Sequence, residues 1–565
     1  MTGASILVYA ERVGGNLGEI EKLLAGPLKD FNGIHVLPFF HPYDGDDAGF
    51  DPIDHKIVDP RLGNWADFKR ISQTHELTAD LIVNHASALS PEFIDWQEKG
   101  DASDYAGLFL TFDTVFPDGG TEAGITSFYR PRPGMPFTAY EVAGKRRLVW
   151  TTFMPSQVDI DIKHEKGQAY LRSVLEALKS GGVKVVRLDA VGYAVKTPGT
   201  DSFMTAETLA FVEEITELIK SYDMRVLVEV HAHYTQQLEI APLVDLIYDF
   251  QTAPLLLHSF FTGTVDRLDN WFKIRPNNCL NVLDTHDGYG VIDGGPINGR
   301  PGLITQDEMA FIFKKAEENT NGHSAIASVI PQWFSLPHQI NATLPNILAD
   351  DVAYVISRAV QFFLPGEPQV YYVGLFNGMD DVELFNKTGQ GRDVNRHNYT
   401  PAELEVAQNQ PVTRPILGLA RLRKLAIFET GAFSWTVLGD DSLRLKWVGA
   451  GASAGETLSL EFKTTVGAAS FVIEHVVDGG ARAGFDVLGG VVGVLGEGAV
   501  ADGGYCCVVN LADVGRVGGS EGVDLGTTEA GALAGVEAGE GGRAEGGKGF
   551  VAEEADLFGC PGVDL

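Results

Sequence analysis

Short apolar segments rich in β-branched residues recur along the chain, and amphipathic helical patterns separate several of them. The apolar segments fall at residues 6–10, 33–40, 79–85, 183–189, 225–231, 246–250, 279–287 and 368–374. Residues 165–181 and 207–223 between them carry apolar positions at helical spacing. Eight strands that alternate with helices predict an α/β fold, a (β/α)8 TIM barrel.

Two connections in this pattern are too long for simple crossovers between parallel strands. Residues 86–164, after the third strand, are rich in Pro, Gly and aromatic residues and predict an inserted B-type domain. Residues 288–367, after the seventh strand, predict a second insertion of loops and helices over the active site. Both insertions leave the carboxyl ends of strands, where barrel active sites lie. The catalytic barrel is therefore expected at residues 1–85 and 165–435.

The barrel pattern stops near residue 436, and two different kinds of sequence follow it. Residues 436–477 alternate between polar and apolar positions and predict a small C-terminal β domain. Residues 478–565 are dominated by Gly, Ala, Val and Glu, so they can bury little apolar surface. We expect this last segment to be poorly ordered, either as a dispensable tail or as an interaction segment.

The net charge of −33 argues against a nucleic acid or an anionic membrane as a partner. No apolar run is long enough for a transmembrane helix, and the first residues lack the basic region of a signal peptide. Cys279, Cys506, Cys507 and Cys560 are sparse and lack metal-ligand spacing. We therefore expect a cytoplasmic protein without a metal site.

Three of the predicted strands carry an acid at or near the carboxyl end, namely Asp189, Glu229 and Asp287. Because the strand ends of a barrel converge on one axis, these side chains are expected to lie close together. Clustered carboxylates repel one another unless cations or shared protons stabilise them, a cost that functional sites tolerate. Retaining glycosyl transfer uses such a group, with one carboxylate as nucleophile and a second as acid and base.

Neighbouring residues favour a division of labour between two of these acids. Arg187 precedes Asp189 by two residues on the same face of the strand and is expected to keep that carboxylate ionised, as a nucleophile must be. Glu229 lies between Val228 and Val230, and apolar surroundings raise the pKa of a general acid.

The strand ends resemble those of the α-amylase superfamily of glycoside hydrolases. The matching segments are GIHVLPFF, ADLIVNH, VVRLDAV, VLVEVH and NVLDTHDG. Within this superfamily the chain is most similar to the sucrose phosphorylase subgroup. That similarity rests on DAGFDPIDH (47–55), YRPRPGMPFT (129–138), QVDIDI (157–162), DAVGYAVK (189–196), RAVQFFLPGEPQVYYVG (358–374) and GRDVNRHNY (391–399). The resemblance covers residues 5 to about 460.

The resemblance implies a retaining α-glucosyl phosphorylase that converts sucrose and inorganic phosphate to α-D-glucose 1-phosphate and D-fructose. It implies that Asp189 is the nucleophile, Glu229 the acid/base and Asp287 the transition-state stabiliser. The donor subsite is then expected at Asp47, Phe50, His85, Phe153, Gln157, Arg187, His286 and Arg396. The acceptor side, for phosphate or the leaving sugar, is expected at Arg132, Tyr193 and His231. The resemblance implies no metal or cofactor, and it suggests a homodimer.

One segment departs from the subgroup. Its members typically carry Leu-Asp-Leu-Tyr-Gln before the eighth strand, whereas residues 334–341 read FSLPHQIN. Gln339 is kept, His338 stands where Tyr is usual, and the Asp is absent. Sucrose 6'-phosphate, glucosylglycerol and glucosylglycerate therefore stay open as donors, and so does a hydrolase or transglucosylase of the same superfamily. A non-catalytic binding barrel is disfavoured because all three acids are present.

Several expected binding residues also have a structural interpretation. Phe50 and Phe153 fit an ordinary apolar core, and His286 fits a hydrogen-bonded core histidine. His85 fits a cap at a strand end, and Arg132 fits a solvated loop.

Overall fold

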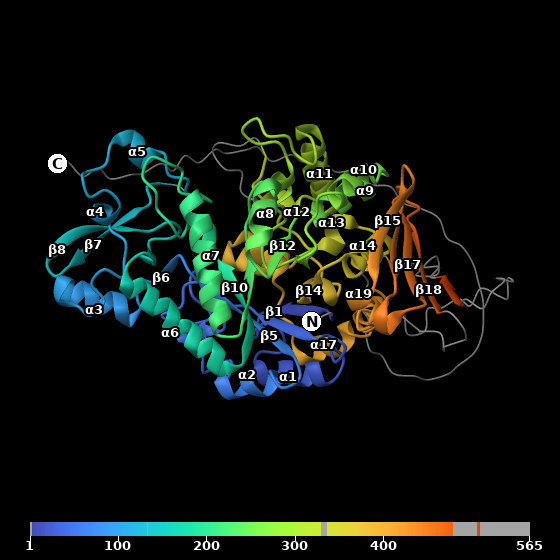
Figure 1. Cartoon of the computed structure of the whole chain (residues 1–565), viewed down its shortest axis with the longest axis horizontal. Coiled ribbons are helices and arrows are strands. Elements are labelled where there is room, and N and C mark those ends of the chain that lie inside the picture. The colour runs from blue at the N-terminus through green and yellow to red at the C-terminus, as the bar shows by residue number, and fades with distance from the viewer. Residues whose placement is uncertain (1–2, 133, 329–335, 478–504, 509–565) are drawn as a thin grey trace, which may run out of the picture. The chain divides into compact units, whose positions relative to one another are not determined.

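The computed structural model describes residues 3–132, 134–328, 336–477 and 505–508. The chain divides into two compact units, Met1–Val514 and Gly515–Leu565, and all described residues belong to the first. Eight parallel strands of this unit close into a barrel in the order β1-β14-β13-β12-β11-β10-β5-β2 (Figure 1). They are β1 (Ser5–Val8), β2 (Gly33–Val36), β5 (Glu76–Ile82), β10 (Val183–Asp189), β11 (Arg225–Val228), β12 (Leu246–Asp249), β13 (Cys279–Asn281) and β14 (Glu367–Tyr371). The predicted fold class is confirmed.

The helix α6 (Glu165–Gly181) outside the barrel buries one apolar stripe. Its buried positions, Tyr170, Leu171, Val174, Leu175 and Leu178, recur every three or four residues. The helix ends where Gly182 adopts a left-handed conformation that glycine enters without strain. Further helices between barrel strands include α1 (Leu17–Ala25), α2 (Trp65–Ile71), α7 (Ala206–Ser221), α8 (Tyr234–Ile240), α9 (Thr252–Thr262), α10 (Asp266–Phe272) and α14 (Asp351–Phe363).

The two ends of the segment 86–164 lie side by side where it leaves and rejoins the barrel. The strand β6 (His85–Ser87) at its start pairs antiparallel with β9 (Gln157–Asp159) at its end. Between them lie α3 (Pro91–Lys99), α4 (Phe112–Val115), α5 (Glu122–Thr126) and the hairpin of β7 (Phe137–Val142) and β8 (Lys145–Trp150). Part of the segment packs around a small apolar cluster of its own: Leu110, Val115, Phe116 and Trp150.

The connection from β13 to β14 is mostly helical. It contains α11 (Gln306–Asn319), α12 (His323–Ala327), α13 (Leu344–Leu348) and α14. Beyond β14 come α15 (Tyr372–Leu375), α16 (Val382–Thr388), α17 (Pro401–Ala407), α18 (Thr413–Leu422) and α19 (Ile427–Thr430). An additional short hairpin, β3 (Phe40–His41) with β4 (Asp54–Val58), follows β2.

The C-terminal sheet is larger than the sequence predicts. It contains β15 (Ala432–Gly439), β16 (Ser442–Val448), β17 (Glu456–Lys463), β18 (Ser470–Val477) and β19 (Tyr505–Val508) in antiparallel order. It thus begins four residues before the expected boundary, and β19 comes from the segment assigned to the tail. The remainder of that segment, residues 478–504 and 509–565, lies outside the described residues.

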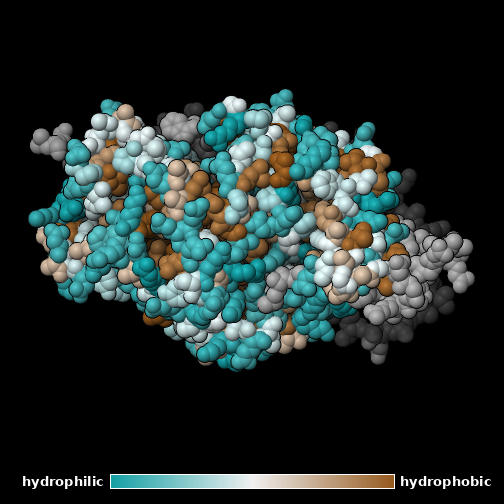
Figure 2. Space-filling view, viewed as in Figure 1, coloured by the Kyte–Doolittle hydropathy of each residue, from teal (hydrophilic) through white to brown (hydrophobic). Residues whose placement is uncertain are grey.

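None of the described helices has both the length and the apolar character that crossing a membrane requires. The face in Figure 2 is mostly hydrophilic, with apolar residues scattered in small groups. Apolar residues distributed in this way are normal on a globular protein.

Candidate active site

Two cations tie the three strand-end carboxylates together. Asp189 is the last residue of β10, Glu229 directly follows β11, and Asp287 lies in the loop after β13. The guanidinium of Arg187 places Nη1 3.0 Å from Asp189 Oδ1 and Nη2 2.8 Å from Glu229 Oε2. His231 Nε2 lies 3.3 Å from Glu229 Oε1 and 3.8 Å from Asp287 Oδ2. The structure therefore brings the three predicted catalytic acids into one ion-paired group.

A second pair of buried side chains, Asp80 and His35, holds Arg187 in place. Its Nη1 also donates to Asp80 of β5, and Asp80 Oδ2 in turn lies 3.0 Å from His35 Nε2 of β2. Asp80 and His35 are fully buried, and the Arg187 side chain is 1 % exposed. Because Arg187 is bonded on both sides, its guanidinium is a rigid support for the acids above it.

The pKa shifts of Asp189 and Glu229 run in the opposite directions to those expected. Burial raises the pKa of Asp189 well above its ordinary value, since Arg187 divides its charge among Asp80, Asp189 and Glu229 and only partly compensates. Burial also opposes ionisation of Glu229, but the charges of Arg187 and His231 outweigh it and lower the pKa of that carboxyl. The sequence analysis instead expected Arg187 to lower the pKa of Asp189 and apolar neighbours to raise that of Glu229.

Asp287 is ionised by a different set of cations. Arg392 Nη1 lies 2.6 Å from its Oδ1, and Arg396 Nη2 lies 3.9 Å from the same oxygen. Burial opposes the charge, but Arg392, His286 and His231 lower the pKa of Asp287 well below its ordinary value. Arg396 Nε also donates to the main-chain carbonyl of His286 at 3.0 Å, which fixes the loop that carries Asp287.

The expected donor-subsite residues form a continuous wall beside the acids. The ring of Phe50 stacks on His286 with centroids 5.3 Å apart. His85 Nε2 contacts Phe50 O at 3.0 Å and Gln157 Nε2 at 3.1 Å. Gln157 Nε2 also donates to Asp47 Oδ2 at 3.0 Å. These contacts link residues from four separate segments into one surface, on which a sugar ring has both an aromatic face and polar partners.

Aromatic rings extend this wall toward the expected acceptor side. Phe153 lies 5.4 Å from the ring of His85 and 5.1 Å from that of Tyr193. Tyr193 also stacks on Tyr129 at 6.1 Å, a residue that the sequence analysis did not select. The row of rings connects the donor subsite to the loop 127–132.

Of the expected acceptor residues, His231 is the one that the structure ties most closely to the acids. Its imidazole stacks on Phe250 at 4.3 Å, and its Nδ1 lies 3.5 Å from Asp293 Oδ2. Although burial opposes the charge, the contacts with Asp287, Asp293 and Glu229 raise the pKa of His231 well above its ordinary value. His231 is therefore an imidazolium at neutral pH.

The remaining acceptor residues lie at different distances from the acids. Gln339 is buried and its Oε1 accepts a hydrogen bond from Arg392 at 3.4 Å. Burial and the positive charges of His231 and Arg392 lower the pKa of His338, against the pull of Asp293. Arg132 is exposed, whereas Arg130 of the same loop donates to Phe153 O at 2.8 Å. In the divergent segment 334–341, residues 336–341 are described.

Comparison with known proteins places this site in a family. The family model "Alpha amylase, catalytic domain" matches residues 20–250. A sucrose phosphorylase from Bifidobacterium adolescentis is 44 % identical over 468 residues, which is 82 % of this chain and 92 % of that protein. The chain belongs to the α-amylase family, in its sucrose phosphorylase group.

Two further relatives define the breadth of this group. The sucrose 6(F)-phosphate phosphorylase from Thermoanaerobacterium thermosaccharolyticum is 34 % identical over 78 % of this chain and 91 % of that protein. The crystal structure of sucrose 6F-phosphate phosphorylase from Thermoanaerobacter thermosaccharolyticum has a TM-score of 0.77 and 32 % identity. It covers 84 % of this chain and 96 % of that chain.

A metal ion is not the best occupant of the acid cluster in this member of the sucrose phosphorylase group. Glu229, His231 and Asp287 each offer one potential ligand atom, and these atoms lie within 4.8 Å of one another. A metal needs a neutral imidazole, however, and the raised pKa of His231 means that a proton competes with a metal for this ring. The charge distribution favours an ion-paired acid/base site.

The sequence analysis missed several residues of the site. Asp80 and Asp293 contact Arg187 and His231, and Arg392 contacts Asp287. Asp80 lies within the quoted segment ADLIVNH, and Arg392 within GRDVNRHNY, so the segments were identified without these members. The position of Asp293 in the sequence does not identify it as a site residue. It lies close to His231 because the chain turns at Val291–Gly294.

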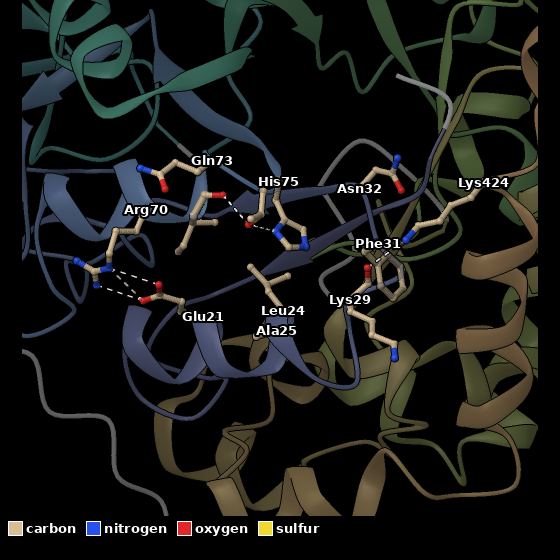
Figure 3. Close-up of a pocket in the computed structure, with 12 residues that line it drawn as sticks. Glu21, Leu24, Ala25, Lys29, Phe31, Asn32, Arg70, Gln73, His75 and Lys424 are labelled. Carbon is tan, nitrogen blue, oxygen red and sulfur yellow. Dashed lines mark hydrogen bonds and ion pairs between the residues drawn. The ribbon is translucent and has the colours of Figure 1, made fainter.

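Another hollow, of about 600 Å³, lies at the amino-terminal end of the barrel strands (Figure 3). Two of its basic side chains are already engaged, since Arg70 Nη2 lies 3.1 Å from Glu21 and Lys424 Nζ 3.1 Å from Asp30. The C-terminal turns of α1 and α2 line it, and the partial negative charge of a helix C-terminus disfavours anions. The hollow therefore resembles a solvated edge of the barrel more than a ligand site.

Proposed function

We propose that this protein is a retaining α-glucosyl phosphorylase that converts sucrose and inorganic phosphate to α-D-glucose 1-phosphate and D-fructose. The observation that carries the proposal is the single guanidinium of Arg187 shared by Asp189 and Glu229. A double displacement requires a carboxylate nucleophile and a second carboxyl close to it that acts as acid and base, and the shared guanidinium holds these two side chains together. The 44 % identity to sucrose phosphorylases supports the same reaction.

In the first half-reaction Asp189 attacks the anomeric carbon and forms a covalent glucosyl ester. The bond to the fructosyl oxygen breaks, and Glu229 donates its proton to that oxygen. This step needs an ionised Asp189 and a protonated Glu229, so donor binding must lower the pKa of Asp189 and raise that of Glu229. The glycosidic oxygen offers protonated Glu229 a hydrogen-bond acceptor, and positive charge that develops at the anomeric carbon favours an ionised Asp189. Asp287, which Arg392 keeps ionised, stabilises that charge as well.

In the second half-reaction phosphate replaces fructose on the acceptor side. Glu229 accepts a proton from the phosphate, a phosphate oxygen attacks the anomeric carbon, and the ester to Asp189 breaks. Two inversions give net retention, so the product is the α-anomer. The imidazolium of His231 lies 3.3 Å from Glu229 and supplies a positive charge for the incoming anion. Arg132 is exposed three residues after Tyr129 in the loop 127–132, and it is the second cation expected on the acceptor side.

Sucrose 6'-phosphate is the second candidate donor, because of the divergent segment near His338. In the segment where the group typically carries an Asp and a Tyr, this chain has Leu336 and His338. The charges of His231 and Arg392 act on His338. A missing carboxylate and an added imidazole favour a phosphorylated aglycone. The relative with that activity is 34 % identical, against 44 % for two of the sucrose phosphorylases, so sucrose stays the first candidate. Glucosylglycerol and glucosylglycerate remain further alternatives.

A cytoplasmic location and a homodimer are also proposed. The location rests on the sparse cysteines, of which Cys279 is a buried free thiol. The homodimer rests on the family resemblance. Light scattering of the purified chain measures its mass in solution, and a monomer at working concentration would contradict the second proposal.

The decisive experiment incubates the protein with sucrose in the presence and absence of phosphate. We expect glucose 1-phosphate only when phosphate is present, and the α-anomer by NMR. The Asp189→Asn variant serves as the control for contaminating activity. Free glucose released at equal rates with and without phosphate would identify a hydrolase instead. The same assay with sucrose 6'-phosphate, glucosylglycerol and glucosylglycerate ranks the donors by kcat/KM.

A further inference from the structure

A buried lysine joins three segments of the chain behind the donor subsite. Lys196 follows the turn at Val191–Tyr193, and its side chain is 3 % exposed. Its Nζ lies 2.7 Å from Asp159 Oδ2, donates to Asn84 Oδ1 at 2.9 Å and donates to Tyr193 O. An ammonium has three N–H donors and no acceptor, so these three oxygens satisfy it completely.

Each oxygen that accepts from Lys196 belongs to, or directly precedes, a segment of the subsite wall. Asn84 precedes His85 at the start of β6. Asp159 ends β9, whose first residue is Gln157. Tyr193 is itself the aromatic residue after the nucleophile strand. Lys196 therefore contacts the residue before β6, the last residue of β9 and the turn after β10. The wall residues His85, Gln157 and Tyr193 lie at these same places.

Asp159 extends the connection to the middle of the aromatic row. Its Oδ1 accepts a hydrogen bond from the main-chain N–H of Thr152 at 3.0 Å, and its Oδ2 accepts one from the Thr152 hydroxyl at 2.5 Å. Thr152 directly precedes Phe153, whose ring lies between those of His85 and Tyr193. A displacement of Asp159 would therefore move Phe153 with it.

We propose that Lys196 is a positioning residue for the glucosyl donor: its ammonium holds His85, Phe153 and Tyr193 in one row beside the nucleophile strand. This inference rests on the proposed function. The inserted segment is joined to the barrel wall here by β6 and β9, which pair over three residues only. Arg130 holds the main chain at Thr152 and Phe153 from the loop side. The bonds from Lys196 through Asp159 are the contacts that tie the same stretch to Asn84 and Tyr193.

The energetics indicate why this position needs a cation rather than an apolar side chain. Asp159 is fully buried, and without Lys196 its carboxylate would keep only the bonds from Thr152. A buried carboxylate that loses its counterion is strongly destabilised and recruits water or shifts toward solvent. The structure near Phe153 would therefore rearrange instead of collapsing around a methionine or an alanine.

The test compares Lys196→Met and Lys196→Ala with Arg423→Met. Arg423 is another buried cation, bonded to the carbonyls of Phe362, Leu364 and Gly366 far along the chain from the site. We expect both Lys196 variants to lose at least tenfold in kcat/KM, with sucrose and with glucose 1-phosphate alike, because the wall serves every glucosyl donor. Arg423→Met should lower the melting temperature without changing kcat/KM well below that temperature.

Chemical rescue separates positioning from general destabilisation. Ethylammonium added to Lys196→Ala should restore part of kcat/KM and should slow the increased hydrogen exchange at residues 84–87 and 150–159. Wild-type kinetics in Lys196→Met would overturn the proposal. So would a loss that matches the unfolded fraction, as in Arg423→Met, and that the amine does not reverse.

Two further measurements keep the test decisive. If the Lys196 variants do not fold, Thr152→Val removes one bond to Asp159 with Lys196 in place, and it should raise KM for the donor several-fold. Unchanged donor kinetics in this variant would then refute the proposal. If the wild-type chain phosphorolyses none of the donors, the proposed function fails, whereas the exchange and rescue measurements still report on Lys196.

Discussion

The substitution His231→Gln tests whether the imidazolium is the cation that lets phosphate, rather than water, accept the glucosyl group. His231 is the one residue that contacts both Glu229 and Asp287 among the cations described here, and its ring lies flat on Phe250. Glutamine keeps an N–H donor of similar reach but carries no charge. The variant therefore removes the charge and leaves much of the shape.

The expected magnitude follows from the contacts. A net hydrogen bond to a charged group contributes about 1.5–3 kcal/mol, which corresponds to about 10- to 150-fold in kcat/KM for phosphate. Attack by water needs no anion, so release of free glucose should fall much less. Loss of the imidazolium also raises the pKa of Glu229, because His231 helps to lower it, and the pH optimum should move upward.

The assay follows glucose 1-phosphate and free glucose in the same reaction over a range of phosphate concentrations. We expect the ratio of phosphorolysis to hydrolysis to fall by at least tenfold in His231→Gln, mainly through a higher KM for phosphate. Circular dichroism and a donor-binding measurement control for misfolding. An equal fall of both products would show that His231 serves the glucosyl transfer itself, and an unchanged ratio would exclude it from phosphate recognition.

Three further variants test other parts of the interpretation. Asp189→Asn should abolish turnover while calorimetry still detects sucrose binding, and substantial residual turnover would mean that another residue is the nucleophile. The double variant Leu336→Asp/His338→Tyr should lower kcat/KM for sucrose 6'-phosphate relative to sucrose by about tenfold, since the new carboxylate repels a phosphate; an unchanged ratio would show that this segment does not select the aglycone. Arg423→Met should reduce the free energy of unfolding by about 2–4 kcal/mol in urea, because buried carbonyls lose their donor, and a gain in stability would show that desolvation of the guanidinium dominates.

The barrel was predictable because each of its strands is a short apolar run. Such a run can be identified from its own residues, without knowing which strand it pairs with. The strand β19 was not, since Tyr505–Val508 lies among glycines and joins the sheet only by pairing with β18. The hairpin of β3 and β4 was missed for a related reason. Its two-residue strand β3 continues the apolar run that contains β2, and no change in periodicity separates them.

The acids of the site were predictable from their position at strand ends, but the balance of charge around them was not. Arg187 precedes Asp189 by two residues, which suggested a simple pair. In the structure the same guanidinium also contacts Asp80, which is 107 positions away along the chain, and Glu229. Because three carboxyls share one cation, the charge of Arg187 offsets only part of the cost of ionising the buried Asp189. No local pattern in the sequence reveals that sharing.

This sharing explains how a protein with a net charge of −33 can use phosphate as a substrate. The carboxyls Asp80, Glu229, Asp287 and Asp293 are paired with Arg187, His231, Arg392 and Arg396, and burial raises the pKa of Asp189. These ion pairs offset much of the negative charge of the centre although the protein is acidic. When Asp189 becomes a glucosyl ester it carries no charge, so the centre is receptive to an anion at the step where phosphate must enter. A variant that adds one uncompensated carboxylate near His231 would lose this property first, and it would do so before it lost the ability to cleave the donor.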